Sequence, residues 1–292
     1  MKRLAVCLFL LTAVLFAEVR VSGIDVLDLG TDALLPQFSA DGRYILYGAP
    51  DGLYMYDRQT SVSSRFADSG YDPVMDEAGV IRYRIDHYER GHRTSTIAVY
   101  DTKTLDRAYV LEGVRPDAMP KITDHGVYYV EKNTIKSETL RATRPSRPVA
   151  FVLGNAVVLY SYGTSRILQP AGDRPHIWPS VSPQGDKLCV VGGNDMYVTD
   201  LSGKVLFTIA DARAPQWSPD GSRIAFMSDT DDGHVITGSD IYLVRADGSG
   251  LTRLTATEDL MEMYPQWSPD GRQIICDNPA DGRPVLLTLE MQ

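Results

Sequence analysis

The chain has 292 residues with a formal net charge of −9, 43% apolar residues and 23% charged residues. A chain this long and this apolar can bury a sizeable core, which excludes disorder as its main state. The acidic balance argues against nucleic-acid binding, because phosphate neutralisation needs clustered Lys and Arg. The length is that of one large domain or two small ones.

The first 17 residues have the pattern of a secretory signal peptide. A basic pair, Lys2 and Arg3, precedes the apolar run 4–16, and Ala17 is a small residue at the expected cleavage site. The run is shorter than the roughly 20 residues that a membrane-spanning helix needs. We therefore expect residues 18–292 to form one exported, monomeric domain without a membrane span, in the periplasm or outside the cell.

Two cysteines remain after that cleavage, Cys189 and Cys276. Both fall in predicted strands, in repeats that another full repeat separates. A disulfide needs Cα atoms within about 7 Å of one another, so we expect none. We expect two small, buried, apolar side chains instead.

A four-column pattern repeats six times along the chain. Each copy has a proline, a large apolar residue two positions later, a small polar residue three positions later and a glycine six positions later. The prolines are Pro36, Pro73, Pro120, Pro179, Pro215 and Pro265. In Ser218–Gly221 the small polar residue and the glycine are the first and last residues of a type I turn. Ser can hydrogen-bond to the turn backbone, Pro pre-sets φ at the second position, and Gly permits the backbone conformation with which the turn ends.

Apolar strands surround each turn. In the fifth repeat the segments Ile224–Met227, Ile241–Val244 and Leu251–Thr255 follow the strand that contains the proline. Each unit therefore has four antiparallel strands. One such sheet cannot bury both of its faces, so neighbouring units must stack. Radial stacking gives an all-β fold, the β-propeller, and an open sandwich is the alternative architecture.

We expect six blades, with seven as the alternative. The interval between Pro120 and Pro179 holds either one blade with an added hairpin or two degenerate blades, and Pro148 and Gly154 keep the six-residue offset there. The last unit is one strand short. We expect the N-terminal strand Ile24–Leu29 to complete that last blade and so remove a free sheet edge.

The repeat resembles that of TolB-type β-propellers, which are similar in turn to the propellers of prolyl oligopeptidases and dipeptidyl peptidases. Pro215–Phe226, Asp240–Leu243 and Ala246–Thr255 show the resemblance best, and it covers essentially residues 24–292. The α/β domain that TolB carries before its propeller is not expected here, nor is the peptidases' hydrolase domain. The resemblance implies docking to an envelope protein, such as a peptidoglycan-associated lipoprotein.

The sequence contains no G-x-S-x-G elbow, HExxH, P-loop, or GxGxxG ahead of a helix. We therefore expect a non-enzymatic, protein-binding scaffold in the cell envelope. One alternative is a carbohydrate-active lyase or hydrolase at the central pocket of the propeller. Another is a small-ligand sensor with a polar channel, for which Gln37, Gln216 and Gln266 are candidates unless they bond to neighbouring backbone.

Two polar segments are predicted to be long loops between the second and third strands of their blades. His87 and His92 share the first loop, which is either a metal or anion site or a solvated hairpin. The second loop alternates Asp before Gly, as calcium loops do, which makes Asp229, Asp231 and Asp232 candidate calcium ligands. Its spacing is one residue short of the EF-type order.

Both loops should open on the same face as the links that lead into the prolines. Aromatic residues and Arg on loops of a rigid scaffold are common binding anchors. The alternative for the aromatic residues in the links is packing between blades. The partner-binding face predicted from this pattern consists of His87, Tyr88, Arg90, His92, Trp178 and Tyr264.

Overall fold

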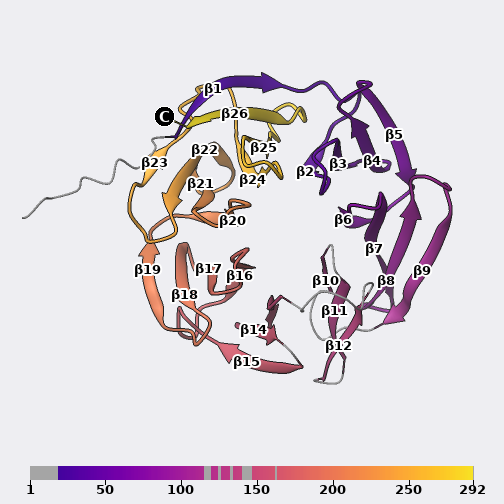
Figure 1. The fold of residues 1–292 in the computed structure, drawn as a ribbon, viewed down its shortest axis with the longest axis horizontal. Coiled ribbons are helices and arrows are strands. Elements are labelled where there is room, and N and C mark those ends of the chain that lie inside the picture. Colours follow the sequence, from indigo (N-terminus) through magenta and orange to yellow (C-terminus); the bar gives the residue numbers. More distant parts are fainter. Residues whose placement is uncertain are drawn as a thin grey trace, which may run out of the picture.

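The computed structural model describes residues 19–114, 120–123, 126–131, 134–139, 147–161 and 163–291. Its regular structure within these ranges is entirely β, with 26 strands (Figure 1). None of these residues belongs to a helix that is long and apolar enough to span a membrane. The predicted signal peptide, residues 1–17, lies outside the described residues.

The strands form antiparallel sheets arranged radially around a central axis (Figure 1). Blade 1 holds β2 (Leu34–Phe38), β3 (Tyr44–Ala49), β4 (Gly52–Asp57) and β5 (Val62–Ala67). Blade 2 holds β6 (Tyr71–Met75), β7 (Val80–Glu89), β8 (His92–Asp101) and β9 (Arg107–Val114). Blade 3 holds β10 (Lys121–Ile122), β11 (Gly126–Glu131) and β12 (Thr134–Thr139), and blade 4 holds β13 (Val149–Leu153), β14 (Ala156–Ser161) and β15 (Thr164–Leu168).

The second half of the ring is regular. Blade 5 holds β16 (His176–Val181), β17 (Lys187–Gly192), β18 (Asp195–Asp200) and β19 (Val205–Ile209). Blade 6 holds β20 (Arg213–Trp217), β21 (Arg223–Asp231), β22 (Ile236–Arg245) and β23 (Thr252–Arg253). Blade 7 holds β24 (Met263–Trp267), β25 (Gln273–Asp277), β26 (Val285–Met291) and β1 (Val19–Val26).

The described residues thus form seven blades, so the expectation of six is wrong and the seven-blade alternative is right. The long interval in the repeat contains both blade 3 and blade 4. Pro148 directly precedes β13, and Gly154 lies in the turn between β13 and β14, as Gly193 does between β17 and β18. The six-residue offset of Pro148 and Gly154 is therefore coincidental and does not mark an inner strand.

The N-terminal strand closes the ring as predicted. β1 pairs antiparallel with β26, from Ile24 opposite Leu287 to Val26 opposite Val285, and blade 7 therefore joins both ends of the chain (Figure 1). The strand runs from Val19 to Val26, earlier than the expected Ile24–Leu29. Closure gives β26 a partner along its outer edge, where it would otherwise expose unpaired backbone groups.

The hydrophobic core lies between neighbouring blades. Met227 of blade 6, for example, packs with Ile274 and Leu287 of blade 7. Cys189 and Cys276 are free, fully buried members of these clusters, and burial raises the pKa of the Cys189 thiol to about 12. Both cysteines act as small apolar side chains, as expected.

The tryptophans of the repeat also join blades. The indole Nε1 of Trp217 donates a hydrogen bond to the Ser180 carbonyl of blade 5 at 3.0 Å. Trp267 does the same to the Gln216 carbonyl of blade 6 at 3.2 Å. Their rings therefore pack in the core while their N–H groups hold the inner strand of the preceding blade.

The turns of the repeat lie together on one side of the disc, which we call the turn face. In blade 6 the Ser218 hydroxyl donates to Asp220 at 2.6 Å, and the Gly221 amide donates to the Ser218 carbonyl at 2.8 Å. These bonds confirm the predicted turn chemistry. Glycine suits the end of this turn because the φ of Gly42 is 71°, a backbone conformation that residues with a Cβ rarely adopt.

Five inner strands share one irregularity just before the repeated proline. The residues there have positive φ: Leu35 (49°), Asp72 (51°), Trp178 (51°), Ala214 (48°) and Tyr264 (51°). At each of these places the pairing with the second strand shifts register, which marks a β-bulge. Proline has no N–H to offer, so it suits an edge strand that faces the central opening.

Candidate binding face

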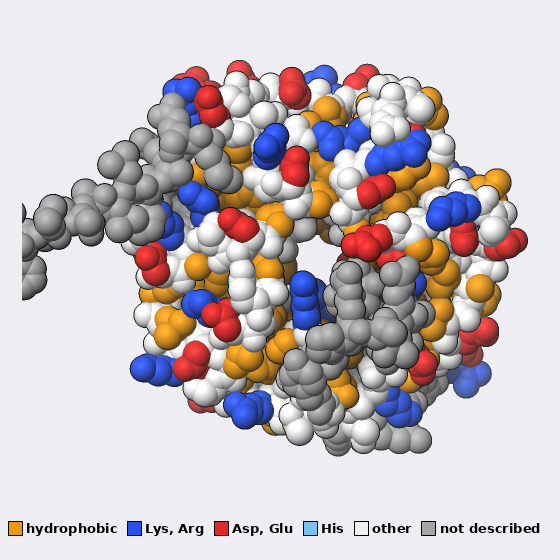
Figure 2. All heavy atoms as spheres, in the orientation of Figure 1, with side chains coloured by type: hydrophobic (Ala, Val, Ile, Leu, Met, Phe, Trp, Pro, Cys, Tyr) orange, Lys and Arg blue, Asp and Glu red, His pale blue; other side chains and the backbone are white. Residues whose placement is uncertain are grey.

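The inner strands all begin on the side of the disc opposite the turn face, and we call this side the mouth face. Because β7 and β21 run antiparallel to the inner strands of their blades, their far ends also reach the mouth face. An opening passes through the centre of the disc, with basic and acidic side chains at its edge (Figure 2).

A set of apolar side chains occupies the start of the inner strands on the mouth face. Leu35 and Tyr71 are each 55% exposed, and Leu34 and Ile177 are also exposed. We call the set the rim, and its members are Leu34, Leu35, Tyr71, Ile177, Trp178 and Tyr264. The bulge puts one residue per inner strand at positive φ, and in blades 1, 5 and 7 that residue is a large rim side chain.

Trp178 and Tyr264 meet although a whole blade separates their strands. Their ring centroids are 6.2 Å apart with an interplanar angle of 69°, an edge-to-face arrangement. Blade 6 has Ala214 at the equivalent position, and both rings pack against the cluster that contains it. A small residue in the intervening blade therefore lets the two aromatic side chains bridge blades 5 and 7.

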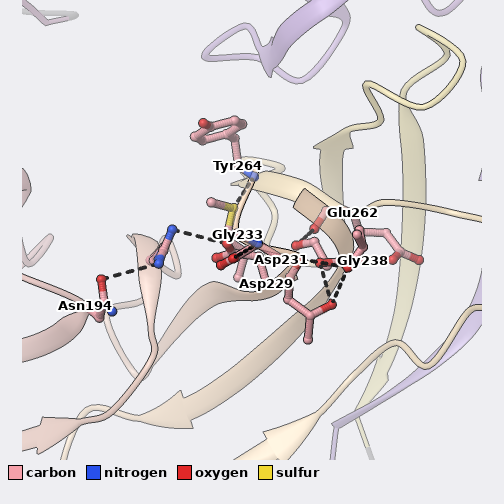
Figure 3. A network of polar contacts seen from close by, with 12 residues as sticks. Asn194, Asp229, Asp231, Gly233, Gly238, Glu262 and Tyr264 are labelled. Atoms are coloured by element: carbon pink, nitrogen blue, oxygen red, sulfur yellow. Dashed lines mark hydrogen bonds and ion pairs between the residues drawn. The ribbon is translucent and has the colours of Figure 1, made fainter. Parts of the chain in front are cut away.

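A polar network lies beside this aromatic pair (Figure 3). Arg213 forms an ion pair with Asp229 at 3.1 Å and donates to the Asn194 side chain at 3.3 Å. The Asp229 side chain is only 2% exposed, and that guanidinium is the cation that faces it. The Tyr264 amide donates to the Met227 sulfur at 3.4 Å, and burial, followed by the nearby carboxylates, raises the pKa of the Tyr264 hydroxyl.

Charged residues of blades 2 and 3 line the other side of the mouth. Arg84 is buried, lies 3.3 Å from both Asp72 and Asp86, and has its guanidinium 5.4 Å from the centre of the Tyr71 ring. Lys121 stands on β10, the innermost strand of its blade (Figure 1). Its side chain is solvent-accessible, yet surrounding protein lowers the pKa of its amine, and the charge of Asp72 opposes that shift.

The segment around His87 is not a loop. β7 and β8 continue their ladder to Glu89 opposite His92, and Arg90 and Gly91 form a two-residue turn with φ of 50° and 78°. Positive φ at both central residues is the geometry of a type I′ hairpin turn, which matches the twist of the strands. We call the projecting part of this hairpin, residues 85–94, the hairpin arm.

The structure brings together only part of the predicted face. Trp178 and Tyr264 are in contact, whereas His87, Tyr88, Arg90 and His92 belong to the hairpin arm on blade 2. Tyr88 is 72% exposed. The two groups share the mouth face, but they come from different blades.

The three candidate calcium ligands are engaged elsewhere. Asp229 pairs with Arg213, Asp231 accepts the Gly233 amide at 2.8 Å, and Asp232 accepts the His234 and Val235 amides at 2.9 Å. The backbone bonds lower the pKa of Asp232. Among the described residues no group of three His, Cys, Asp or Glu side chains is arranged to hold a metal. Calcium binding here stays a prediction.

The predicted partner-binding face did not include Leu34, Leu35, Tyr71 or Ile177, although Tyr71 and Ile177 stand in the links into the prolines from which that face was drawn. The available signal was their place, one or two residues before a repeated proline, which every other member of the rim shares. Reasoning also left the role of the glutamines open. The Gln37 amide donates to the Pro73 carbonyl of blade 2, so this side chain bonds neighbouring backbone.

No protein-family model matches the chain, and no curated protein matches it. Solved structures do resemble it. A chain of the mitotic checkpoint complex has a TM-score of 0.62 at 14% identity, covering 100% of this chain and 98% of that one. Hsv2 of Kluyveromyces lactis has a TM-score of 0.57 at 10% identity, with 90% and 98% covered. The oligogalacturonate lyase of Vibrio parahaemolyticus has a TM-score of 0.60 at 10% identity, with 94% and 98% covered. At these identities the likeness shows the β-propeller fold alone.

Proposed function

We propose that the chain is an exported, TolB-like propeller that acts as a non-enzymatic protein-binding scaffold in the cell envelope. Its binding site is the mouth face, and the rim is the observation that carries the proposal. The signal-peptide pattern, with cleavage after Ala17, supports export to the periplasm or the outside of the cell. The resemblance of the repeats to TolB supports a partner such as a peptidoglycan-associated lipoprotein.

The rim is costly to keep without a binding role. Leu34, Leu35, Tyr71 and Ile177 are 40–55% exposed, so each forgoes roughly half of the about 1.5–3 kcal/mol that full burial would give. Leu35, Trp178 and Tyr264 also hold a backbone conformation that side chains with a Cβ avoid, at a cost of about 1–3 kcal/mol each. Strained residues and exposed apolar patches both tend to mark interaction sites. A partner that covers the rim would bury these apolar side chains and so regain that free energy.

One structural neighbour supports a scaffold role. The mitotic checkpoint complex is a multiprotein assembly, and its propeller chain matches the whole length of this one. A rigid disc can present side chains from several blades to one partner without reorganising, which reduces the entropic cost of binding.

The proposal is tested by in-cell crosslinking of a tagged chain 18–292, followed by mass spectrometry. The wild-type chain should enrich an envelope lipoprotein or another Tol-type component. The Trp178→Ala/Tyr264→Ala variant should lose at least about tenfold of that enrichment, since aromatic anchors often carry 2 kcal/mol or more. A matched control is Trp267→Phe, which changes a core tryptophan away from the mouth face. Equal capture by the wild type and the rim variant would refute the proposal.

A carbohydrate-active enzyme is the second candidate, favoured by Lys121. Lys121 stands on the innermost strand of blade 3, and a lysine with a lowered pKa is suited to act as a base. A structural neighbour is an oligogalacturonate lyase. Incubation of the chain with oligogalacturonate should then release unsaturated sugar, absorbing in the ultraviolet, and Lys121→Met should abolish that signal. No absorbance change with the wild-type chain removes this candidate.

A further inference from the structure

At all but one of the junctions between blades, an apolar side chain from the outermost strand of one blade, or from just after it, joins the cluster shared with the next blade. Phe66 of β5 is the clearest case, because its ring centroid lies 5.6 Å from that of Tyr83 and 5.8 Å from that of Tyr100 in blade 2. The side chains that fill the other junctions in this way are Leu27, Leu111, Leu168, Phe207 and Leu254.

The junction between blades 3 and 4 has no such side chain among the described residues. Its cluster comes from β11, β12, β13 and β14. β12 is the outermost described strand of blade 3 (Figure 1). A groove of about 340 Å³ lies at this junction, and it is open to solvent, since Ile167 in its wall is 72% exposed. The apolar residues that line the groove are Val130, Ile135, Leu153, Val158, Tyr160 and Ile167.

The wall of the groove on blade 4 matches the surface that Phe66 covers on blade 2. That surface presents Ala98 and Tyr100 of β8, two residues apart on one face of the strand. The groove has Val158 and Tyr160 of β14 with the same spacing and on the corresponding strand. The groove is therefore the place where a fourth strand beside β12 would put a large apolar side chain.

The chain is too short at this point to supply that strand itself. Blade 1 uses 22 residues, 58–79, between its third strand β4 and the second strand of blade 2, β7, whereas only nine residues, 140–148, lie between β12 and β13. A five-residue fourth strand runs about 17 Å towards the mouth face, and the chain must return as far, because β13 starts on the turn face. Nine residues span at most about 32 Å, so they cannot form such a strand and still reach blade 4.

Other open strand edges lack this combination. β15 is also the outermost strand of its blade, but the junction that it faces is already filled by Leu168. β5 and β19 belong to blades that have all four strands. A strand added beside β12 would both pair backbone groups and fill an apolar groove, and these are the two contributions that strand addition requires.

We propose that an extended segment of a partner protein completes blade 3 by pairing with β12 as a fourth strand and inserting a Phe or Leu side chain into the groove. Main-chain hydrogen bonds would supply affinity, and the groove would select the side chain. β5 shows the register, because Ala67, next to Phe66, stands opposite Leu53, the second residue of β4. Ile135 has the same place on β12. This site lies at the outer side of the ring and adds a second interaction surface to the rim.

The test uses defined peptides as probes. The first is a fluorescein-labelled peptide with the sequence of residues 60–69, which contains β5 and Phe66. The second carries Phe66→Ala, and the third carries N-methyl groups at its six central residues. Anisotropy with the chain 18–292 should show saturable binding of the first peptide. Binding of the other two should be at least about tenfold weaker, because one loses the anchor and the other loses main-chain hydrogen bonds.

Variants of the chain locate the peptide. Ile167→Glu puts a charge into the groove and Ser165→Trp fills it, and both change exposed residues, so the fold should persist. Each should weaken binding of the first peptide at least about tenfold. Tyr109→Glu is the matched control, because Tyr109 stands opposite Ala98 as Ile167 stands opposite Val158, but at a filled junction. It should change binding by less than about threefold.

Photocrosslinking in cells identifies the occupant. A photoreactive amino acid at position 167 should crosslink to an extended apolar stretch of another protein. Crosslinks confined to this chain or to a second copy of it would overturn the proposal, as would no crosslink at all. Failure of the first peptide to bind, or equal binding of its Phe66→Ala or N-methylated form, would overturn it as well. None of these readouts depends on the rim, so capture that is insensitive to Trp178→Ala/Tyr264→Ala would refute the proposed function alone.

Discussion

The edge of the Trp178 ring meets Tyr264 across an entire blade, with centroids 6.2 Å apart and planes at 69°. The contact exists because blade 6 presents Ala214 where blades 5 and 7 present aromatic residues. Since all three residues have positive φ just before the repeated proline, one backbone irregularity places side chains from three blades at one site. The rim is thus a product of the repeat and of the side chains that vary within it.

Strain at the bulge can be tested at Leu35. This residue has φ of 49° and is 55% exposed, so Leu35→Gly removes about 1–2 kcal/mol of left-handed strain and loses little burial. Glycine costs about 0.5–1 kcal/mol in chain entropy. In urea unfolding, the Leu35→Gly variant should therefore have a free energy of unfolding equal to or higher than that of the wild type. Leu34→Gly, at a neighbouring position without positive φ, should lower the free energy of unfolding by about 1 kcal/mol. A Leu35→Gly variant that is less stable than the Leu34→Gly variant would argue against strain at this bulge.

The Arg213–Asp229 pair is expected to support the mouth face. Arg213→Ala would leave the Asp229 carboxylate, 2% exposed, without its cation. We expect a loss of about 1–3 kcal/mol, below the ~3–5 kcal/mol of a fully buried pair, because Arg213 is itself 31% exposed. The double variant Arg213→Ala/Asp229→Asn should recover part of that loss in urea unfolding. A double variant less stable than Arg213→Ala would contradict this account of the pair.

The sequence predicts those parts of this protein whose backbone geometry is set by the turn residues themselves. The Ser-Pro-Asp-Gly turns encode their own geometry, so the propeller and the strand that closes it followed from pattern alone. Blade 3 keeps the columns at Pro120 and Gly126, whereas blade 4 lacks clear columns, and Pro148 with Gly154 imitated them by chance. The residue before a proline is normally extended, and Trp178 and Tyr264 have no intrinsic preference for positive φ. The bulge, and with it the rim, is therefore a tertiary feature.

The hairpin arm, residues 85–94, shows a second limit of prediction from the sequence. The residues from Asp86 to Arg93 are polar and charged, a composition typical of a loop. They form a regular ladder because the buried pairs lower down, such as Tyr83 opposite Ala98, set the register. The Arg90-Gly91 turn then closes the hairpin.

Stability should depend on pH through Glu262. This side chain is fully buried, and burial raises its pKa above the ordinary 4.5, although the Thr257 hydroxyl donates to it at 2.8 Å. Its folded form binds the proton more tightly than the unfolded chain does. Its contribution therefore makes stability fall as pH rises from about 4.5 through the raised pKa.

Glu262→Gln removes that titration. The variant should be more stable than the wild type at pH 7, and its advantage should shrink as pH falls towards 4.5. Thermal unfolding across this range measures the difference. Glu258→Gln, at an exposed position nearby, is the control and should leave the stability unchanged both at pH 7 and near pH 4.5. A constant difference between Glu262→Gln and wild type at all pH values would mean that the carboxyl does not titrate in this way.

Ring closure can be tested at the N-terminal strand. A chain that starts at Leu27 lacks β1 and exposes the outer edge of β26. It also loses the burial of Val19, so we expect a loss of more than about 2 kcal/mol and concentration-dependent association. Size-exclusion chromatography and thermal unfolding, with a chain starting at Glu18 for comparison, would measure both. A monomeric, equally stable short chain would show that β1 does not close the ring.

The most direct test of the binding role is position-specific photocrosslinking in cells. A photoreactive amino acid at Ile177, an exposed residue of the rim, is compared with one at Ser249, an exposed residue in the turn between β22 and β23 on the turn face. We expect a crosslink to an envelope protein from position 177 and none from position 249. A crosslink from position 249 alone, or equal crosslinks from both, would contradict the claim that the mouth face binds the partner.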